Sequence, residues 1–123
     1  MKSSYQQIEP YTTKDGSEIR ELMHPAVHGN LNQSLAEATV ASGCKTTLHR
    51  HRRTEEVYYI LQGAGTMVLG DETLPVQAGD AICIPPGAAH CIENIGAEPL
   101  RVLCACAPPY DHDDTELLGA TAD

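Results

Sequence analysis

Short apolar stretches, separated by glycine, proline and other turn-forming residues, follow one another through most of the chain from residue 34 onward. Several are rich in β-branched residues, and none has the length or periodicity of a helix. They predict strands at residues 34–41, 57–61, 66–69, 81–84, 91–92 and 100–107. Short strands at near-regular spacing are typical of an all-β sandwich or barrel.

The chain divides into three parts around these strands. Residues 1–33 are mixed and polar, which predicts an N-terminal extended segment with turns and no long helix. Residues 34–109 contain the predicted barrel. Residues 110–123 form an acidic C-terminal tail, which we expect to be solvated and loosely ordered or to lie as a flap over the barrel mouth.

The composition is that of an ordinary globular protein with one domain, since 41% of its 123 residues are hydrophobic and 20% are charged. A formal net charge of −9 argues against nucleic acid or an anionic membrane as the main partner. No apolar run is long enough to span a membrane, and the first residues lack the apolar core of a secretory signal. We therefore expect a cytoplasmic protein. Its five cysteines form no CxxC pair, which predicts mostly small buried side chains rather than disulfides.

The first group of residues with chemical interest is His49-Arg50-His51. Residues two apart in a strand face the same side, so both imidazoles would project into one space. Glu56 follows shortly afterwards, just before a strand-like run. Two imidazoles and a carboxylate suit Zn, Fe, Mn, Ni or Cu. By itself, however, an HxH pair is a weak signal.

The spacing around these residues is more specific. Two segments read Gly43-x5-His49-x-His51-x4-Glu56-x6-Gly63 and Gly79-x5-Pro85-x-Gly87-x2-His90-x3-Asn94. They resemble the two conserved motifs of the cupin superfamily, G-x5-HxH-x3,4-E-x6-G and G-x5-PxG-x2-H-x3-N, at every defining position. The closest resemblance is to small single-domain cupins of the cupin-2 type.

The resemblance implies a double-stranded β-helix, a jelly-roll barrel that holds one divalent transition-metal ion per chain. It assigns four metal ligands: His49, His51, Glu56 and His90. Glu55 competes with Glu56, because the motif permits three or four residues after HxH. Glu56 is favoured because it has six residues before Gly63 and because strand alternation would turn it inward together with Tyr58 and Ile60.

Other residues are also candidates for the site or for the core. Tyr58 is a candidate for orienting a substrate or a plain core residue, and Asn94 is expected to bond to backbone at a turn. Cys104 and Cys106 share one face of the last strand, but both faces are apolar, so the pattern does not tell which one lines the cavity. The run 111–114 has metal-compatible groups but lies in the predicted tail.

A site of this kind supports more than one function. The leading hypothesis is a metal-dependent enzyme, with dioxygenase-type oxidoreductase chemistry first, on a small oxygen-rich or carboxylate substrate. Arg50, Arg52 or Arg53 would then attract a carboxylate, although surface solvation is their ordinary role. The alternative is a non-catalytic module that binds or senses a small carboxylate or sugar. A sugar isomerase, epimerase or lyase ranks last, because the inward positions visible in the sequence look too apolar.

The expected partners are a small-molecule ligand and a second copy of the chain. One-barrel cupins commonly dimerise by adding the N-terminal segment to a neighbour's sheet, and residues 1–30 have an extended, polar character that would allow this. We expect a homodimer.

Overall fold

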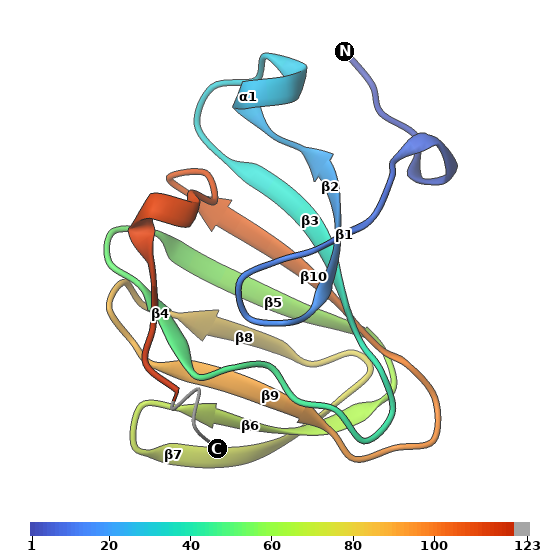
Figure 1. The fold of residues 1–123 in the computed structure, drawn as a ribbon, viewed down its shortest axis with the longest axis vertical. Coiled ribbons are helices and arrows are strands. Elements are labelled where there is room, and N and C mark those ends of the chain that lie inside the picture. Colours follow the sequence, from blue (N-terminus) through green and yellow to red (C-terminus); the bar gives the residue numbers. More distant parts are fainter. Residues whose placement is uncertain (120–123) are drawn as a thin grey trace.

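The computed structural model describes residues 1–119 and shows two antiparallel β-sheets that face each other (Figure 1). The first sheet has six strands in the order β1-β2-β3-β10-β5-β8. Their bounds are β1 Tyr11–Thr12, β2 Glu18–Met23, β3 Ser34–Val40, β10 Leu100–Ala107, β5 Glu55–Gln62 and β8 Ala81–Ile84.

The second sheet has five strands in the order β11-β4-β9-β6-β7. Their bounds are β11 Thr115–Leu117, β4 His49–His51, β9 His90–Asn94, β6 Ala64–Leu69 and β7 Glu72–Gln77. In the part of the chain that the structure describes, helical structure is limited to three short pieces: η1 Tyr5–Gln7, α1 Pro25–His28 and η2 His112–Asp114. Within residues 1–119, none of these helices is long and apolar enough to cross a membrane.

Strand alternation fills the space between the sheets. In β5, Glu56, Tyr58 and Ile60 are buried, whereas the residues between them point outward and are exposed. The same alternation on the other strands produces one continuous apolar core that occupies part of this space. Its most deeply buried members are Ile60, Met67, Ile84, Leu100 and Val102. The prediction of an all-β jelly-roll barrel is confirmed.

Glycine is required where β5 ends. Gly63 has a φ of +92°, in the left-handed region that side chains other than glycine rarely adopt. A Cβ at this position would also lie 3.1 Å from the carbonyl oxygen of Pro99. The glycine that closes the first motif is therefore a structural requirement of the turn between β5 and β6.

Both terminal segments are part of the sheets. β2 pairs with β3 of the same chain, and β1 pairs with β2. β11 pairs with β4, so Thr115 lies opposite His51 (Figure 1, red segment beside β4). The expectation of a loosely ordered tail is wrong for residues 110–119, because ladder hydrogen bonds and the buried Asp114 hold this segment against the barrel. The rest of that tail, residues 120–123, lies outside the described residues.

Candidate metal centre

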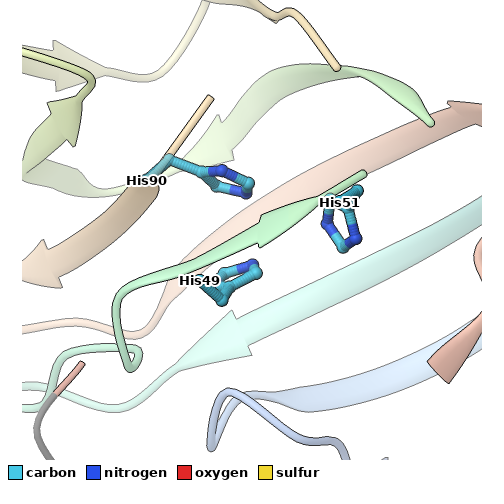
Figure 2. A group of neighbouring side chains, drawn as sticks. All are labelled: His49, His51 and His90. Carbon is cyan, nitrogen blue, oxygen red and sulfur yellow. The ribbon is translucent and has the colours of Figure 1, made fainter. Parts of the chain in front are cut away.

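Three buried histidines from two strands meet inside the barrel (Figure 2). β4 contributes His49 and His51, which share a face because they are two residues apart. β9 begins with His90, which pairs with His49 across the antiparallel ladder. One ring nitrogen from each histidine lies within 4.8 Å of those of the other two. The two motifs of the sequence thus converge on one point because their strands are neighbours.

Each imidazole is fixed through its Nδ1 atom. The Nδ1–H groups of His49 and His90 donate to the carbonyl oxygens of Thr47 and Ala88, at 2.7 and 3.0 Å. The Nδ1 atom of His51 lies 2.9 Å from the Thr115 hydroxyl. That hydroxyl donates its own proton to the carbonyl of Asp111, so it accepts the hydrogen bond from His51. All three Nε2 atoms therefore present a lone pair to the site.

A buried carboxylate lies beside two of the three imidazoles. Glu56 Oε1 lies 3.1 Å from His51 Nε2 and 3.4 Å from His90 Nε2. Its other oxygen, Oε2, accepts a hydrogen bond from the Cys106 thiol at 3.4 Å. Glu55 is exposed on the outer face of β5, so the predicted choice of Glu56 as the inward carboxylate is confirmed.

The charge distribution at this point calls for a cation. With hydrogen on Nδ1, the Nε2 lone pairs of His51 and His90 face the carboxylate oxygen of Glu56 at short distance, and such groups repel unless a positive charge lies between them. Among the described residues, Glu56 Oε1 and His90 Nε2 are buried without a hydrogen-bond partner. Buried polar atoms are rarely left unpaired. Three imidazole nitrogens and a carboxylate oxygen are also the donor set that divalent transition metals prefer, so these residues fit such an ion.

The pKa values of the site reflect burial and mutual contact. Burial raises the pKa of Glu56, whereas positive charge and hydrogen donors at His51 and His90 would lower it to about 2. With hydrogen on Nδ1 these two rings donate nothing to Glu56, so a cation bound between the groups would have to keep the carboxylate ionised. Burial and the neighbouring His90 lower the pKa of His49, which keeps its imidazole neutral. Burial and the charge of Glu56 raise the pKa of Cys106, so its thiol keeps the proton that it donates.

The cavity beside the histidines is lined by residues from both ends of the chain. Positions 11, 13, 15, 17, 19 and 21 of the N-terminal hairpin all face it, which is a strict two-residue alternation. The C-terminal segment adds Tyr110 and Thr115, and the β3 and β10 strands add small side chains. The lining thus contains Tyr11, Thr13, Asp15, Ser17 and Glu21, which are polar. The expectation of an apolar lining missed these hairpin residues, which add polar groups to a wall that is otherwise mostly apolar.

These polar lining residues were missed because their alternation is not hydrophobic. Alternation between apolar and polar residues marks a strand that faces a core, whereas here the inward side chains are themselves mostly polar. The signal that would have found them is the period of two from Tyr11 to Glu21, on either side of the Asp15-Gly16 turn.

The remaining candidate residues fall into two groups. Tyr58, Cys104 and Cys106 line the cavity, which settles the face of the last strand. Asn94 is buried and bonds to backbone, as predicted: its amide donates to the carbonyls of Val40 and Glu98.

The arginines are not at the cavity. Arg50 and Arg52 pair with Glu116, and Arg53 pairs with Asp114. None of the three is among the lining residues of this cavity. The buried carboxylate of Asp114 accepts hydrogen bonds from backbone N–H groups and is not part of the histidine cluster. The hypothesis that these arginines attract a carboxylate into the site is therefore not supported by their positions.

Comparison with known proteins agrees with this architecture. The Cupin domain family matches residues 36–106, which is more than half of the chain. The chain belongs to the cupin family. The uncharacterized protein MJ1618 of Methanocaldococcus jannaschii is 55% identical over 118 residues, which cover 96% of this cupin and 94% of that protein.

Two further relatives come from Thermotoga maritima. An oxalate-binding protein is 31% identical over 86 residues, which cover 70% of this chain and 71% of that protein. The crystal structure of a predicted oxalate decarboxylase superposes with a TM-score of 0.77 at 26% identity and covers 88% of this chain and 99% of that one. The jelly-roll barrel of this cupin is thus shared with solved structures along most of its length.

Proposed function

We propose that this cupin holds one divalent transition-metal ion through His49, His51, His90 and Glu56 and is a metal-dependent enzyme. We assign it dioxygenase-type oxidoreductase chemistry on a small oxygen-rich substrate. One observation carries the proposal: the Nε2 lone pairs of two histidines face an unpartnered carboxylate oxygen in a buried space beside a cavity. Family membership and the oxalate-related relatives support a metal-binding role.

The chain's own residues prepare this site in two ways. Thr47, Ala88 and Thr115 hold the imidazoles with their Nε2 atoms turned inward. Cys106 holds one oxygen of Glu56 and leaves the other free. A bound divalent ion would supply a Lewis acid, and iron, manganese or copper would also supply redox chemistry.

The walls of the cavity restrict the substrate. Three neutral imidazoles and one carboxylate leave a divalent ion with a net charge of about +1, which favours a substrate with one negative charge. The lining contains two further acids, Asp15 and Glu21, and no lysine or arginine among the described residues. A second negative charge on the substrate would be repelled by these acids. We therefore assign a substrate that is neutral or carries one carboxylate or enolate.

The test combines metal analysis with turnover. Elemental analysis of the protein as purified, without added metal, is expected to find close to one Fe, Mn or Cu per chain. The His49→Ala and His90→Ala variants are expected to lose this metal. His28→Ala is the matched control, because His28 lies on α1 and does not line the cavity. Metal content that survives in both cluster variants would refute the proposed centre.

Turnover is measured separately on the metal-loaded protein. Oxygen consumption is followed with an electrode against a panel of diketones, thiols, flavonols and organic acids. We expect at least one member of the panel to be consumed together with O2. If O2 uptake stays at the level of the metal-free protein and the whole panel is unchanged, the dioxygenase assignment is wrong.

The second candidate is a binding module for a small carboxylate, and the Thermotoga maritima oxalate-binding protein favours it. It predicts that oxalate raises the melting temperature of the metal-loaded protein and is recovered unchanged after long incubation. The acids in the cavity argue against a dicarboxylate, so we expect a monocarboxylate to stabilise the protein more than oxalate does.

We further propose that the chain forms a homodimer in the cytoplasm. Four exposed apolar side chains lie on the outer face of the six-stranded sheet and support an interface there: Leu35, Val57, Tyr59 and Leu61. Light scattering at micromolar concentration is expected to give twice the chain mass, and a monomeric mass would contradict this proposal.

A further inference from the structure

The tip of the N-terminal hairpin is fixed over the cavity by contacts on both sides. Within the hairpin, the backbone N–H of Thr13 donates to the carbonyl of Ser17 at 3.0 Å. On one side, the N–H of Thr47 donates to the carbonyl of Asp15 at 2.8 Å. On the other side, the Lys14 ammonium donates to the carbonyls of two residues in the C-terminal segment, at 2.8 and 2.9 Å. Asp15 therefore has a defined place relative to the histidines.

The two oxygens of Asp15 have different surroundings. Oδ1 accepts hydrogen bonds from the backbone N–H and the hydroxyl of Ser17, at 2.9 and 2.7 Å. Oδ2 lies 3.6 Å from His49 Nε2, which is longer than a hydrogen bond, and it has no hydrogen-bond donor among the described residues. The Asp15 side chain is only 12% exposed. One oxygen is thus used by the fold, and the other is a free acceptor at the edge of the histidine cluster.

Asp15 differs from Glu56 in its relation to the cluster. Glu56 Oε1 approaches two histidines, at 3.1 and 3.4 Å, whereas Asp15 Oδ2 approaches only one. Asp15 also comes from the hairpin that forms the wall of the cavity, and not from the strands that carry the histidines. Asp15 thus faces the cavity at the edge of the histidine cluster.

We propose that Asp15 Oδ2 is the specificity-determining acceptor of the site and selects substrates that carry a hydroxyl group next to their metal-binding oxygen. The ligand class is therefore α-hydroxy acids, hydroxy-ketones and enediols, which bring one donor and at most one negative charge. This inference rests on the proposed metal centre and names the substrate class for it. A hydroxyl that donates to a buried carboxylate forms a strong, charge-assisted hydrogen bond.

The experiment compares two probes of which only one has this donor. Glycolate has a carboxylate and a neighbouring hydroxyl, and methoxyacetate has the same carboxylate with the hydroxyl proton replaced by a methyl group. Each is titrated into the Co(II)-loaded protein and followed by the visible spectrum of the ion. We expect the wild-type protein to bind glycolate about tenfold more tightly, as a hydrogen bond to a charged group gives.

Asp15→Asn is the decisive variant, because asparagine has nearly the same shape and can still accept from Ser17 while it turns an amide N–H₂ toward the cavity. We expect the preference for glycolate to fall to within about twofold, with Co(II) affinity lowered less than tenfold by the loss of the nearby charge. The matched control is Asp71→Asn, which changes an exposed carboxylate at the β6–β7 turn and should leave both affinities as in the wild type.

Each contrary result has a distinct meaning. If Asp15→Asn weakens Co(II) binding tenfold or more, Asp15 is a metal ligand and the inference is overturned. Equal affinity of the wild type for both probes also overturns it. If the wild-type protein does not bind Co(II), the proposed metal centre itself fails, and this is seen in the metal titration before any probe is added.

Discussion

The hydrogen bond between Thr115 and His51 offers the sharpest test of how the C-terminal segment contributes to the site. Thr115 is 4% exposed, lies opposite His51 in the β4–β11 pair, and joins the His51 imidazole to the carbonyl of Asp111. Thr115→Val keeps the shape of the side chain but removes the hydroxyl. His51 Nδ1 then loses its acceptor, and the preference for the tautomer with a free Nε2 is lost.

The expected effect has two parts. Removal of the partner of a metal-binding histidine typically lowers metal affinity about 10- to 100-fold. This corresponds to about 1.4–2.7 kcal/mol of binding free energy. The metal-free protein also loses two buried hydrogen bonds, so its free energy of unfolding should fall by about 1–3 kcal/mol.

Two measurements separate these parts. Competition with a chelating dye gives the metal affinity of the folded protein, and urea unfolding of the metal-free protein gives its stability. Thr115→Ser is the matched control, because serine keeps the hydroxyl that accepts from His51, and it should retain most of the metal affinity.

Metal binding by Thr115→Val as tight as that of the wild type would contradict this role of Thr115. A loss of metal affinity in Thr115→Ser equal to that in Thr115→Val would contradict it as well. The first result would mean that the tautomer of His51 does not depend on Thr115. The second would mean that the hydroxyl alone does not hold the imidazole, because Thr115→Ser keeps the hydroxyl and lacks only the methyl group.

Three further predictions concern the fold and the ion. A Cβ at Gly65 would lie 2.5 Å from the carbonyl oxygen of Glu93, so Gly65→Ala should lower the free energy of unfolding by about 1–3 kcal/mol. Gly96→Ala should change this free energy little, because a Cβ there has its nearest contact at 3.6 Å. Equal effects of the two variants in urea unfolding would contradict this prediction. Burial opposes ionisation of Asp114, but hydrogen bonds from Arg53 and from the backbone N–H of Thr54 lower the pKa of Asp114 below 3.8. The ionised carboxylate therefore stabilises the fold above pH 3.8, and this contribution is lost as the pH falls further. Asp114→Asn should therefore destabilise the protein at pH 7 and progressively less as the pH falls below 3.8; a difference independent of pH would argue against this ionisation. Removal of the metal by a chelator should lower the melting temperature. Adding the metal back at 100 times its dissociation constant should restore about 2.7 kcal/mol of the free energy of unfolding. An unchanged melting temperature would contradict metal binding to the folded state.

The sequence by itself determined the local features of this protein. Strand alternation identified Glu56 rather than Glu55 as the inward carboxylate, and it placed Tyr58 and Ile60 beside it. The glycine spacing located the turns, and Gly63 has the positive φ that such a turn needs. These features could be predicted because each depends on a backbone period or a conformational preference over a few neighbouring residues.

The position of His90 beside His49 and His51 was predicted less directly. His49 and His51 share a face through the two-residue period, but His90 is 39 positions farther along the chain than His51. Its place beside them followed from the resemblance to cupin motifs and not from the period. The structure supplies the physical reason, since β4 and β9 are neighbouring strands of one sheet.

Only the tertiary structure decided what surrounds this cluster. Asp15 reaches the cavity from the N-terminal hairpin and Thr115 reaches His51 from the last strand, across chain separations that carry no local pattern. Both faces of β10 are apolar, so only the position of the facing sheet shows that Cys104 and Cys106 point inward. The arginines of the first motif look available in the sequence, but they are paired with acids from the C-terminal segment. A sequence pattern records the period of each strand, whereas the partners of a side chain depend on which strands become neighbours, and the packing of the whole barrel sets that.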